Sequence, residues 1–185
     1  MQVVSGEGAR LPDGYCQRVA QYRHRVFVER LGWQLNCQNG METDQFDRPD
    51  TVYVAVENER GDIAGCARLL PTTQPYLLGE VFPQLLNGLP PPCDPTVWEL
   101  SRFAAVDLDD DTVAPLAQIS SSSTGLLLQG AISCAVERGA KRLLSISPLG
   151  IERLSRHLGL RARRAGPPMI IDGHAIMACW FDLVT

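Results

Sequence analysis

The chain has 185 residues, a formal net charge of -4 at pH 7, and 45% hydrophobic and 21% charged residues. These values are typical of one globular domain that is large enough to bury a core. The negative net charge gives no reason to expect a nucleic acid or an anionic membrane as partner. The first residues show no signal-peptide pattern, and no apolar run approaches the roughly 20 residues of a transmembrane helix. We therefore expect a single domain over residues 1–185 in the cytoplasm.

The six cysteines form no C-x-x-C pair, and their spacing suggests neither a metal site nor a disulfide framework. Several lie in apolar runs, where a free thiol behaves as a small hydrophobic group. We expect reduced thiols and no metal.

The first expected element is a helix over residues 11–32, because apolar residues recur there near helical spacing. Asp13 is positioned to cap its start, and Gly32 to end it.

Two strands are expected next, at 51–56 and 63–70, joined by a polar turn at 57–62. A short helix at 76–88, broken near Pro83, follows. The remaining elements are expected in the order strand, helix, strand, helix and hairpin, at 97–107, 124–139, 142–147, 150–159 and 168–183. Within the last of these, Asp172-Gly173 between two apolar runs is typical of a two-residue hairpin turn.

The strand at 97–107 carries Glu99, Ser101 and Arg102 among apolar residues, and Arg68 interrupts the strand at 63–70. A buried charge is costly unless it is paired or used. One interpretation is a structural ion pair between Arg68 and Glu99. The other is a catalytic site on the strand, where alternation places Glu99 and Ser101 on one face and Arg102 on the opposite face.

Two other stretches have an unusual distribution of charge. The loop at 41–50 gathers four acidic residues, which are Glu42, Asp44, Asp47 and Asp50. The stretch from 138 to 164 is mainly basic, which indicates either a solvated face or a patch that binds an acidic partner.

Taken together, these motifs resemble the acyl-homoserine lactone synthases, the LuxI-type autoinducer synthases of bacterial quorum sensing. The residues that carry the resemblance are Arg23, Phe27 and Trp33 in "RHRVFVERLGW", Asp44 and Asp47 in "ETDQFD", Arg68 in "CARLLPTTQPYLL", and Glu99, Ser101 and Arg102 in "WELSRFA". The likeness is close over about the first 105 residues and holds in outline beyond them.

The resemblance implies an α/β (α+β) fold related to the N-acetyltransferases, a three-layer sandwich in which helices flank a mixed, twisted sheet and two central strands splay. It implies acylation of the amine of S-adenosylmethionine from an acyl-[acyl carrier protein]. Lactonisation then releases methylthioadenosine. S-adenosylmethionine is a substrate in this scheme, and no cofactor, nucleic acid or membrane span is expected.

The implied catalytic set is Glu99, Ser101 and Arg102. Glu99 would be the base that deprotonates the substrate amine, Ser101 would line the acyl face, and Arg102 would brace the acidic loop. The implied S-adenosylmethionine-binding set is Arg23, Phe27, Trp33, Asp44, Asp47 and Arg68. The aspartates suit a cation, and Trp33 offers its π face to the sulfonium or stacks on the adenine. Arg23 and Arg68 would hold carboxylates of the substrate or of the loop.

The resemblance also implies an acyl pocket formed by Leu100, Ser101, Phe103, Ser145, Ser147 and Leu149, where a hydroxyl at Ser145 favours a 3-oxo acyl chain unless it bonds to a backbone carbonyl instead. The basic residues Arg138, Lys141, Arg153 and Arg156 are the expected patch for the acidic carrier protein. Two alternatives remain at this stage. One is an acyl-CoA-dependent N-acyltransferase of the same fold, which the acidic stretch 107–111 disfavours because it would repel the phosphates of CoA. The other is a non-catalytic binding module.

Overall fold

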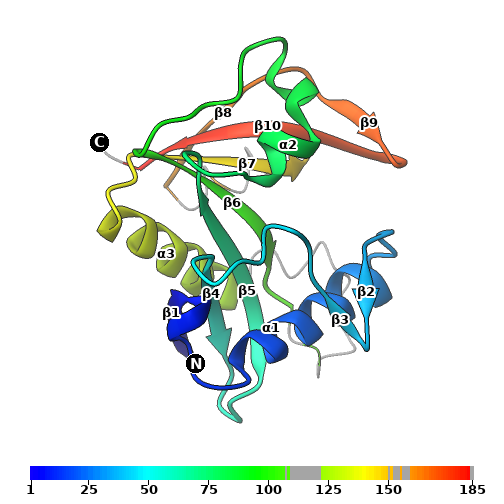
Figure 1. Cartoon of the computed structure of the whole chain (residues 1–185), viewed down its shortest axis with the longest axis vertical. Coiled ribbons are helices and arrows are strands. Elements are labelled where there is room, and N and C mark those ends of the chain that lie inside the picture. Colours follow the sequence, from blue (N-terminus) through cyan, green and yellow to red (C-terminus); the bar gives the residue numbers. More distant parts are fainter. Residues whose placement is uncertain (107, 109–121, 150, 152–154, 156–158, 184–185) are drawn as a thin grey trace. The chain divides into compact units, whose positions relative to one another are not determined.

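The structure, a computed structural model, describes residues 1–106, 108, 122–149, 151, 155 and 159–183 (Figure 1). The chain forms two compact units, Met1–Arg68 with Arg102–Ala131 and Leu69–Ser101 with Ile132–Thr185. The single domain over the whole chain stays a prediction. No helix in the described part of the chain has the length and apolar character that crossing a membrane requires.

The first unit contains both helical and strand elements. They are β1 (Gln2–Glu7), a 3-10 turn (Gly8–Arg10), α1 (Tyr15–Arg23), a π-helix (His24–Arg30), β2 (Cys37–Gln38), β3 (Met41–Glu42), β4 (Val52–Glu57), most of β5 (Ile63–Pro71), the end of β6 (Val97–Ala104) and the start of α3 (Ser122–Glu137). Strand β1 pairs antiparallel with β4, and β2 pairs antiparallel with β3. The expected strands at 51–56 and 63–70 are thus confirmed as β4 and β5, whereas β1 was not expected.

The helix expected at 11–32 is present, with two differences. Asp13 does not cap it, because the N-cap residue is Gly14, whose φ of 78° is left-handed. Residues His24–Arg30 form a π-helix, in which the amide of Leu31 donates to the carbonyl of Val26. Gly32, with φ 69°, follows the end of the helix as expected, because glycine enters the left-handed region without strain.

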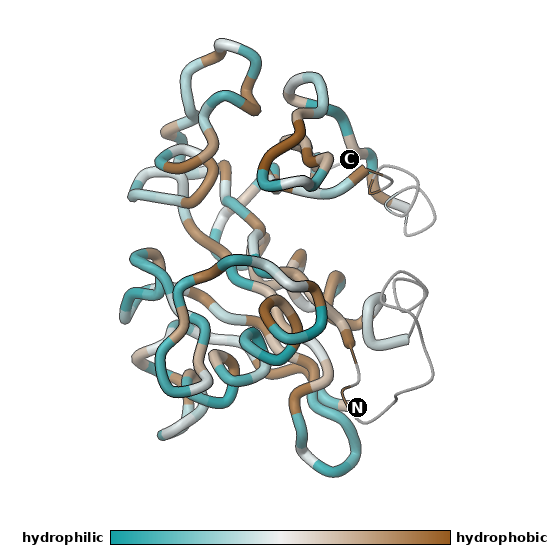
Figure 2. Tube along the Cα trace, turned by 90° about the vertical axis from the view of Figure 1, so that its right-hand side faces the viewer, coloured by the Kyte–Doolittle hydropathy of each residue, from teal (hydrophilic) through white to brown (hydrophobic). Residues whose placement is uncertain are grey.

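The core of the first unit forms where α1 packs on the strands. Tyr15, Val19, Tyr22 and Val26 are each at most 4% exposed and share one helix face. The phenol of Tyr22 donates to the carbonyl of Val106 at 2.9 Å, which ties this face to the chain beyond β6. Figure 2 shows hydrophobic and hydrophilic residues interspersed along the chain, with hydrophilic stretches at several turns.

The second unit contains the start of β6 and the C-terminal strands. Its other elements are α2 (Leu77–Val81), a 3-10 helix (Pro83–Leu86), β7 (Arg142–Pro148), β8 (Arg161–Arg164), β9 (Met169–Ile171) and β10 (His174–Asp182). Strand β10 pairs antiparallel with β7, β8 and β9. Strands β6 and β7 are parallel, and their pairing ends at Glu99 and Leu144 although both strands continue. The two strands therefore part beyond Glu99.

Local turn chemistry explains the expected hairpin. Asp172 and Gly173, with φ of 50° and 79°, connect β9 to β10, and positive φ at both central residues defines the turn that suits a twisted hairpin. The expected break near Pro83 is also present. The expected helix at 150–159 and the acidic stretch 107–111 lie mostly outside the described residues. All six cysteines are described, and none of them is in a disulfide.

Candidate functional site

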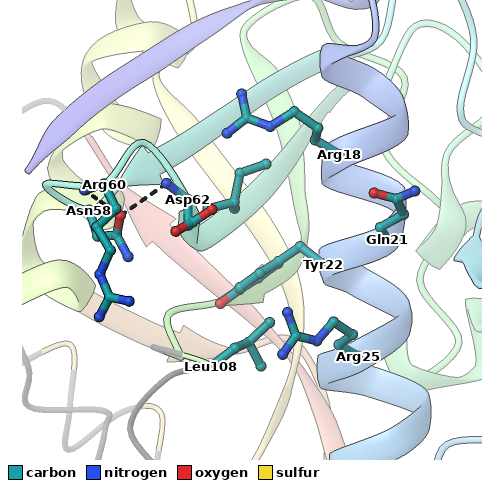
Figure 3. Close-up of a pocket in the computed structure, with 9 residues that line it drawn as sticks. Arg18, Gln21, Tyr22, Arg25, Asn58, Arg60, Asp62 and Leu108 are labelled. Carbon is teal, nitrogen blue, oxygen red and sulfur yellow. Dashed lines mark hydrogen bonds between the residues drawn. The ribbon is translucent and has the colours of Figure 1, made fainter.

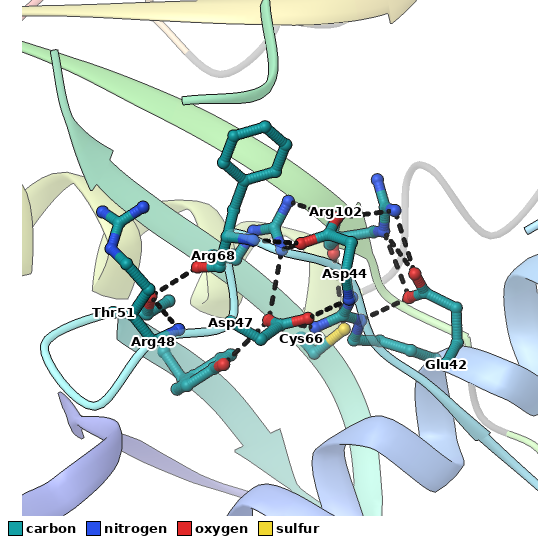
Figure 4. Close-up of polar contacts among 11 residues, drawn as sticks. Glu42, Asp44, Asp47, Arg48, Thr51, Cys66, Arg68 and Arg102 are labelled. Atoms are coloured by element: carbon teal, nitrogen blue, oxygen red, sulfur yellow. Dashed lines mark hydrogen bonds and ion pairs between the residues drawn. The ribbon is translucent and has the colours of Figure 1, made fainter. Parts of the chain in front are cut away.

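A cluster of three arginines and three carboxylates lies in the first unit (Figure 4). Its members come from five segments and are Arg23 of α1, Arg68 of β5, Arg102 of β6, Glu42 of β3, and Asp44 and Asp47 of the loop after β3. All six were singled out in the sequence, and their convergence explains why charges interrupt apolar elements.

The loop that supplies the aspartates is shaped by its own side chains. Asp44 Oδ1 accepts the amide of Phe46 at 2.9 Å, and Asp47 Oδ2 accepts the amide of Asp44 at 2.8 Å. The hydroxyl of Thr51 donates to the carbonyl of Phe46 at 2.6 Å. Aspartate and threonine stabilise turns by such local bonds, so the loop is shaped in part by its own side chains.

Arg23 and Arg68 are the most deeply buried cations of the cluster. Arg23 Nε lies 2.5 Å from Glu42 Oε2, and its Nη1 lies 2.7 Å from Asp47 Oδ1. Arg68 binds Asp44 through two bonds, Nη1 to Oδ1 at 2.6 Å and Nη2 to Oδ2 at 3.0 Å, and its Nη1 also reaches Asp47 at 3.1 Å. Both arginines therefore hold carboxylates of the acidic loop, one of the two roles predicted.

Arg102 braces the same loop. Its Nη2 donates to Glu42 Oε1 at 2.9 Å and to Asp44 Oδ2 at 3.0 Å, and its Nε donates to Glu42 Oε2 at 3.1 Å. This confirms the expected contact with the loop. However, φ of Arg102 is 52°, so the strict strand alternation used to place its side chain does not hold at this residue.

The cluster stays ionised because its charges compensate one another. Burial alone would raise the pKa of Asp47, but the charge and hydrogen bond of Arg23 and the charge of Arg68 hold that pKa below its ordinary value. Burial would likewise raise the pKa of Glu42, but the hydrogen bonds and charges of Arg102 and Arg23 outweigh burial, so this pKa is also lowered. Three positive and three negative charges cancel, so the cluster as a whole is close to neutral.

Aromatic rings border the cluster. Phe27 and Trp33 stack with their centroids 5.0 Å apart and their planes 24° apart. The guanidinium of Arg102 lies 5.9 Å from the centroid of Phe27, and that of Arg68 lies 5.7 Å from the centroid of Phe46. The structure thus brings together all the residues predicted to bind S-adenosylmethionine.

Sequence reasoning missed two members of this site. The phenol of Tyr53 donates to Asp47 Oδ1 at 2.8 Å, and the thiol of Cys66 donates to the carbonyl of Arg102 at 3.3 Å. A tyrosine among the valines of a buried strand needs a partner for its hydroxyl, which is the signal that identifies Tyr53. Nothing in the sequence indicated a polar role for Cys66, because a cysteine in an apolar run looks like any other small hydrophobic residue of the core.

Glu99 belongs to the second unit and is 0% exposed. Its Oε2 accepts the amide of Leu78 at 2.6 Å, so the start of α2 orients the carboxylate. Burial, followed by the charge of Glu99, raises the pKa of the nearby Tyr76. The carboxylate stands where the pairing of β6 and β7 ends, and its role as the base stays a prediction.

The predicted acyl-pocket residues divide between the units. Leu100, Ser101, Ser145 and Ser147 are buried in the second unit, whereas Leu149 is 51% exposed and Phe103 belongs to the first unit. The Oγ atoms of Ser145 and Ser147 are 3.3 Å apart, and Ser145 Oγ is 3.4 Å from the carbonyl oxygen of Ile146.

The predicted carrier-protein patch is described only in part. Lys141 is exposed, and Arg138 Nη1 donates to the carbonyl of Cys134 at 2.9 Å. Arg153 and Arg156 lie outside the described residues. Among the residues that the structure does describe, no group of three or more His, Cys, Asp or Glu side chains is arranged to hold a metal ion.

A separate hollow of about 320 Å³ lies between α1 and the turn that joins β4 to β5 (Figure 3). Its lining residues are Arg18, Gln21, Tyr22, Arg25, Asn58, Arg60, Asp62, Ile63 and Leu108. None of the predicted site residues lines it. Arg18 is already paired with Glu57 at 3.2 Å, so part of its charge is compensated.

Comparison with known proteins defines the class. A family model for autoinducer synthases matches residues 12–184. Acyl-homoserine-lactone synthases of Acinetobacter nosocomialis and Acinetobacter baumannii are 52% and 53% identical, over 99% of this chain and 100% of each relative. A synthase of Pseudomonas aeruginosa is 39% identical over 98% of this chain and 86% of its own length.

Solved structures agree. A crystal structure of TofI in a ternary complex with an inhibitor and MTA superposes with a TM-score of 0.85 at 46% identity, covering 99% of this chain and 92% of TofI. The CoA-dependent acyl-homoserine lactone synthase BjaI, with SAM and isopentyl-CoA, gives a TM-score of 0.84 at 26% identity, covering 98% of this chain and 82% of BjaI. A Lactobacillus plantarum N-acetyltransferase, at 17% identity and a TM-score of 0.63, shares the fold.

The fold is therefore that of the N-acetyltransferases, with a mixed sheet flanked by helices, as expected. The chain belongs to the autoinducer synthase family. Its activity is that of an acyl-homoserine lactone synthase, an acyltransferase, which removes the non-catalytic binding module as an alternative.

Proposed function

We propose that the enzyme transfers an acyl group from acyl carrier protein to the amine of S-adenosylmethionine and then closes the lactone. In the first step the amine attacks the thioester carbonyl, the carbon–sulfur bond breaks, and an amide forms. In the second step the substrate carboxylate attacks its own γ-carbon, and methylthioadenosine leaves with the sulfur. Glu99 accepts the amine proton, directly or through a water, so that the nitrogen lone pair becomes available.

The observation that carries the proposal is the donor left over in the buried cluster. Arg23 Nη2 is buried and has no hydrogen-bond partner among the described residues, although the Nε and Nη1 atoms of the same side chain are bound. A substrate carboxylate would satisfy it. The Phe27–Trp33 stack supplies the aromatic surface for the sulfonium or the adenine.

The structures of relatives support this choice of substrate. TofI has been crystallised with MTA, which is the product of the proposed reaction. BjaI has been crystallised with SAM, which is the substrate of that reaction. Methylthioadenosine release on mixing the enzyme with S-adenosylmethionine and an acyl donor tests the proposal. Acyl transfer to another amine without methylthioadenosine release would contradict it.

The carrier protein is the proposed donor because the basic stretch from Arg138 to Arg164 suits an acidic partner. Acyl-CoA is the second candidate, because BjaI is CoA-dependent. Methylthioadenosine release should be measured with carrier-bound and CoA-bound acyl groups of the same chain. A higher kcat/KM for the CoA thioester would show that acyl-CoA, and not the acylated carrier protein, is the preferred donor. Both donors belong to the cytoplasm, where we place the enzyme.

The proposed acyl chain carries a 3-oxo group and is of medium to long length. The hydroxyls of Ser145 and Ser147 lie within the buried stretch of β7 beyond the end of its pairing with β6. Ser145 Oγ already has the carbonyl oxygen of Ile146 as an acceptor at 3.4 Å, so a 3-oxo oxygen would have to compete with that long bond. A site that hydrogen-bonds a substrate group discriminates better than one that only fits methylenes.

A further inference from the structure

Strand β6 changes conformation at Arg102. Its φ of 52° is left-handed, although the residue lies inside Val97–Ala104. A side chain other than glycine is disfavoured there by contacts of its Cβ, so the surrounding structure must hold the residue in place. The left-handed conformation changes the direction of the Arg102 side chain, because a break in the strand pattern turns the side chain away from its regular position. Here the re-aimed guanidinium binds Glu42 and Asp44.

The neighbouring strand supplies the restraint on the backbone. The thiol of Cys66 in β5 donates to the carbonyl oxygen of Arg102 at 3.3 Å, within the distance expected of a sulfur donor. Its neighbour Gly65 shows how close the strands are, since a Cβ built there would lie 3.3 Å from the carbonyl oxygen of Ala104. Burial raises the pKa of Cys66 to about 12, so the thiol keeps its proton near neutral pH and remains a donor.

We propose that Cys66 is a positioning residue, which holds the backbone of Arg102 in its left-handed conformation and thereby keeps the guanidinium on Glu42 and Asp44 at the S-adenosylmethionine site. The consequence for the substrate rests on the proposed function. The structural part of the inference does not, because it concerns contacts within the protein alone. Two measurements test the structural role of Cys66 and its consequence for the substrate separately.

The first measurement needs no substrate. Arg102 and Arg23 both donate from Nε to Glu42, at 3.1 and 2.5 Å. In Cys66→Ala, hydrogen exchange at the Nε–H of Arg102, followed by NMR, should become about tenfold faster, while that of Arg23 stays within about twofold of the wild type. Cys66→Ser keeps a donor and should restore most of the protection. Equal acceleration at both arginines, or no change at Arg102, would overturn the proposal, because general loosening affects both alike.

The second measurement is kinetic. Cys66→Ala should raise the KM for S-adenosylmethionine about three- to fivefold, the effect of one weak hydrogen bond, with kcat near the wild-type value. The KM of Cys66→Ser should lie between those of the wild type and Cys66→Ala. Cys134→Ala, which removes another buried thiol from α3, should leave this KM unchanged. An unchanged KM in Cys66→Ala would overturn the role at the site. A wild-type enzyme that does not use S-adenosylmethionine would instead refute the proposed function, and the exchange experiment would still decide whether Cys66 holds Arg102.

Discussion

Replacing Asp47 by Asn tests whether the buried charge cluster is held together by charge rather than by shape. Asp47 Oδ1 accepts hydrogen bonds from Arg23 at 2.7 Å, Arg68 at 3.1 Å and the phenol of Tyr53 at 2.8 Å, while Oδ2 accepts the amide of Asp44 at 2.8 Å. Asparagine has nearly the same shape but only one acceptor oxygen. Whichever way its amide turns, an NH2 group faces donors.

The magnitude follows from burial. Arg23 and Arg68 are 1% and 0% exposed, so solvent cannot replace the lost negative charge. The cluster changes from three charges of each sign to a net positive charge of one. Removing one partner of a buried ion pair costs about 3–5 kcal/mol, because the other charge stays buried without compensation. That loss is a large part of the about 5–15 kcal/mol that stabilises a typical domain.

Urea unfolding at pH 7, followed by circular dichroism, measures the loss. The matched control is Asp182→Asn, which removes the partner of Arg163 at 3.1 Å, where the two side chains are 62% (Arg163) and 35% (Asp182) exposed. Exposed pairs contribute about 0–1 kcal/mol, so this variant should unfold close to the wild type. If Asp47→Asn loses no more than Asp182→Asn, compensation of charge within the cluster does not stabilise the fold, and the reasoning is wrong.

The remaining predictions concern pH, the base, the acyl chain and the donor. Because the folded-state pKa of Asp47 is lowered, its stabilisation is complete above about pH 4 and is lost as the pH falls further, so acid unfolding should begin there and be shallower in Asp47→Asn. Glu99→Gln keeps an oxygen for the amide at the start of α2, so it should fold normally yet lose about 10²-fold or more in acyl transfer; near-normal turnover would remove Glu99 as base. Ser145→Ala should weaken the preference for 3-oxo over unsubstituted acyl carriers of equal length, and an unchanged preference would show that Ser145 does not read that position. Reversing Arg153 and Arg156 to glutamate should raise the KM for the acylated carrier but not for S-adenosylmethionine, an effect that salt should reduce; if neither reversal nor salt matters, the basic stretch is only a solvated face.

The parts of the fold that sequence could predict are those determined by local chemistry. The turn at Asp172 and Gly173 requires positive φ at two successive residues, which this pair provides. Strands β1 and β8 could not be found in the same way. Gln2–Glu7 is mostly exposed or half-buried and shows no apolar face, and Arg161–Arg164 carries three arginines in four residues. Both depend on pairing with a distant strand, which no short pattern records.

The site shows the same division. Charges in apolar strands identified Arg68 and Arg102, because burying a charge is costly enough to leave a trace in the sequence. The left-handed backbone of Arg102 left none, since arginine is not the residue type that indicates positive φ. The π-helix at His24–Arg30 was hidden for a similar reason, because its residues fit an α-helix equally well.

The charge balance of the cluster changes how a cationic substrate would be recognised. The family resemblance implied that Asp44 and Asp47 suit the cationic sulfonium and amine of the substrate. In the structure both carboxylates are bound by arginines. Asp44 accepts two bonds from Arg68, and Asp47 accepts bonds from Arg23 and Arg68, so their negative charge is largely compensated within the protein. A nearly neutral cluster adds little long-range attraction for a cation. We therefore expect the cation to be recognised mainly at short range by the faces of the stacked Phe27 and Trp33 rings, with Nη2 of Arg23 serving the substrate carboxylate.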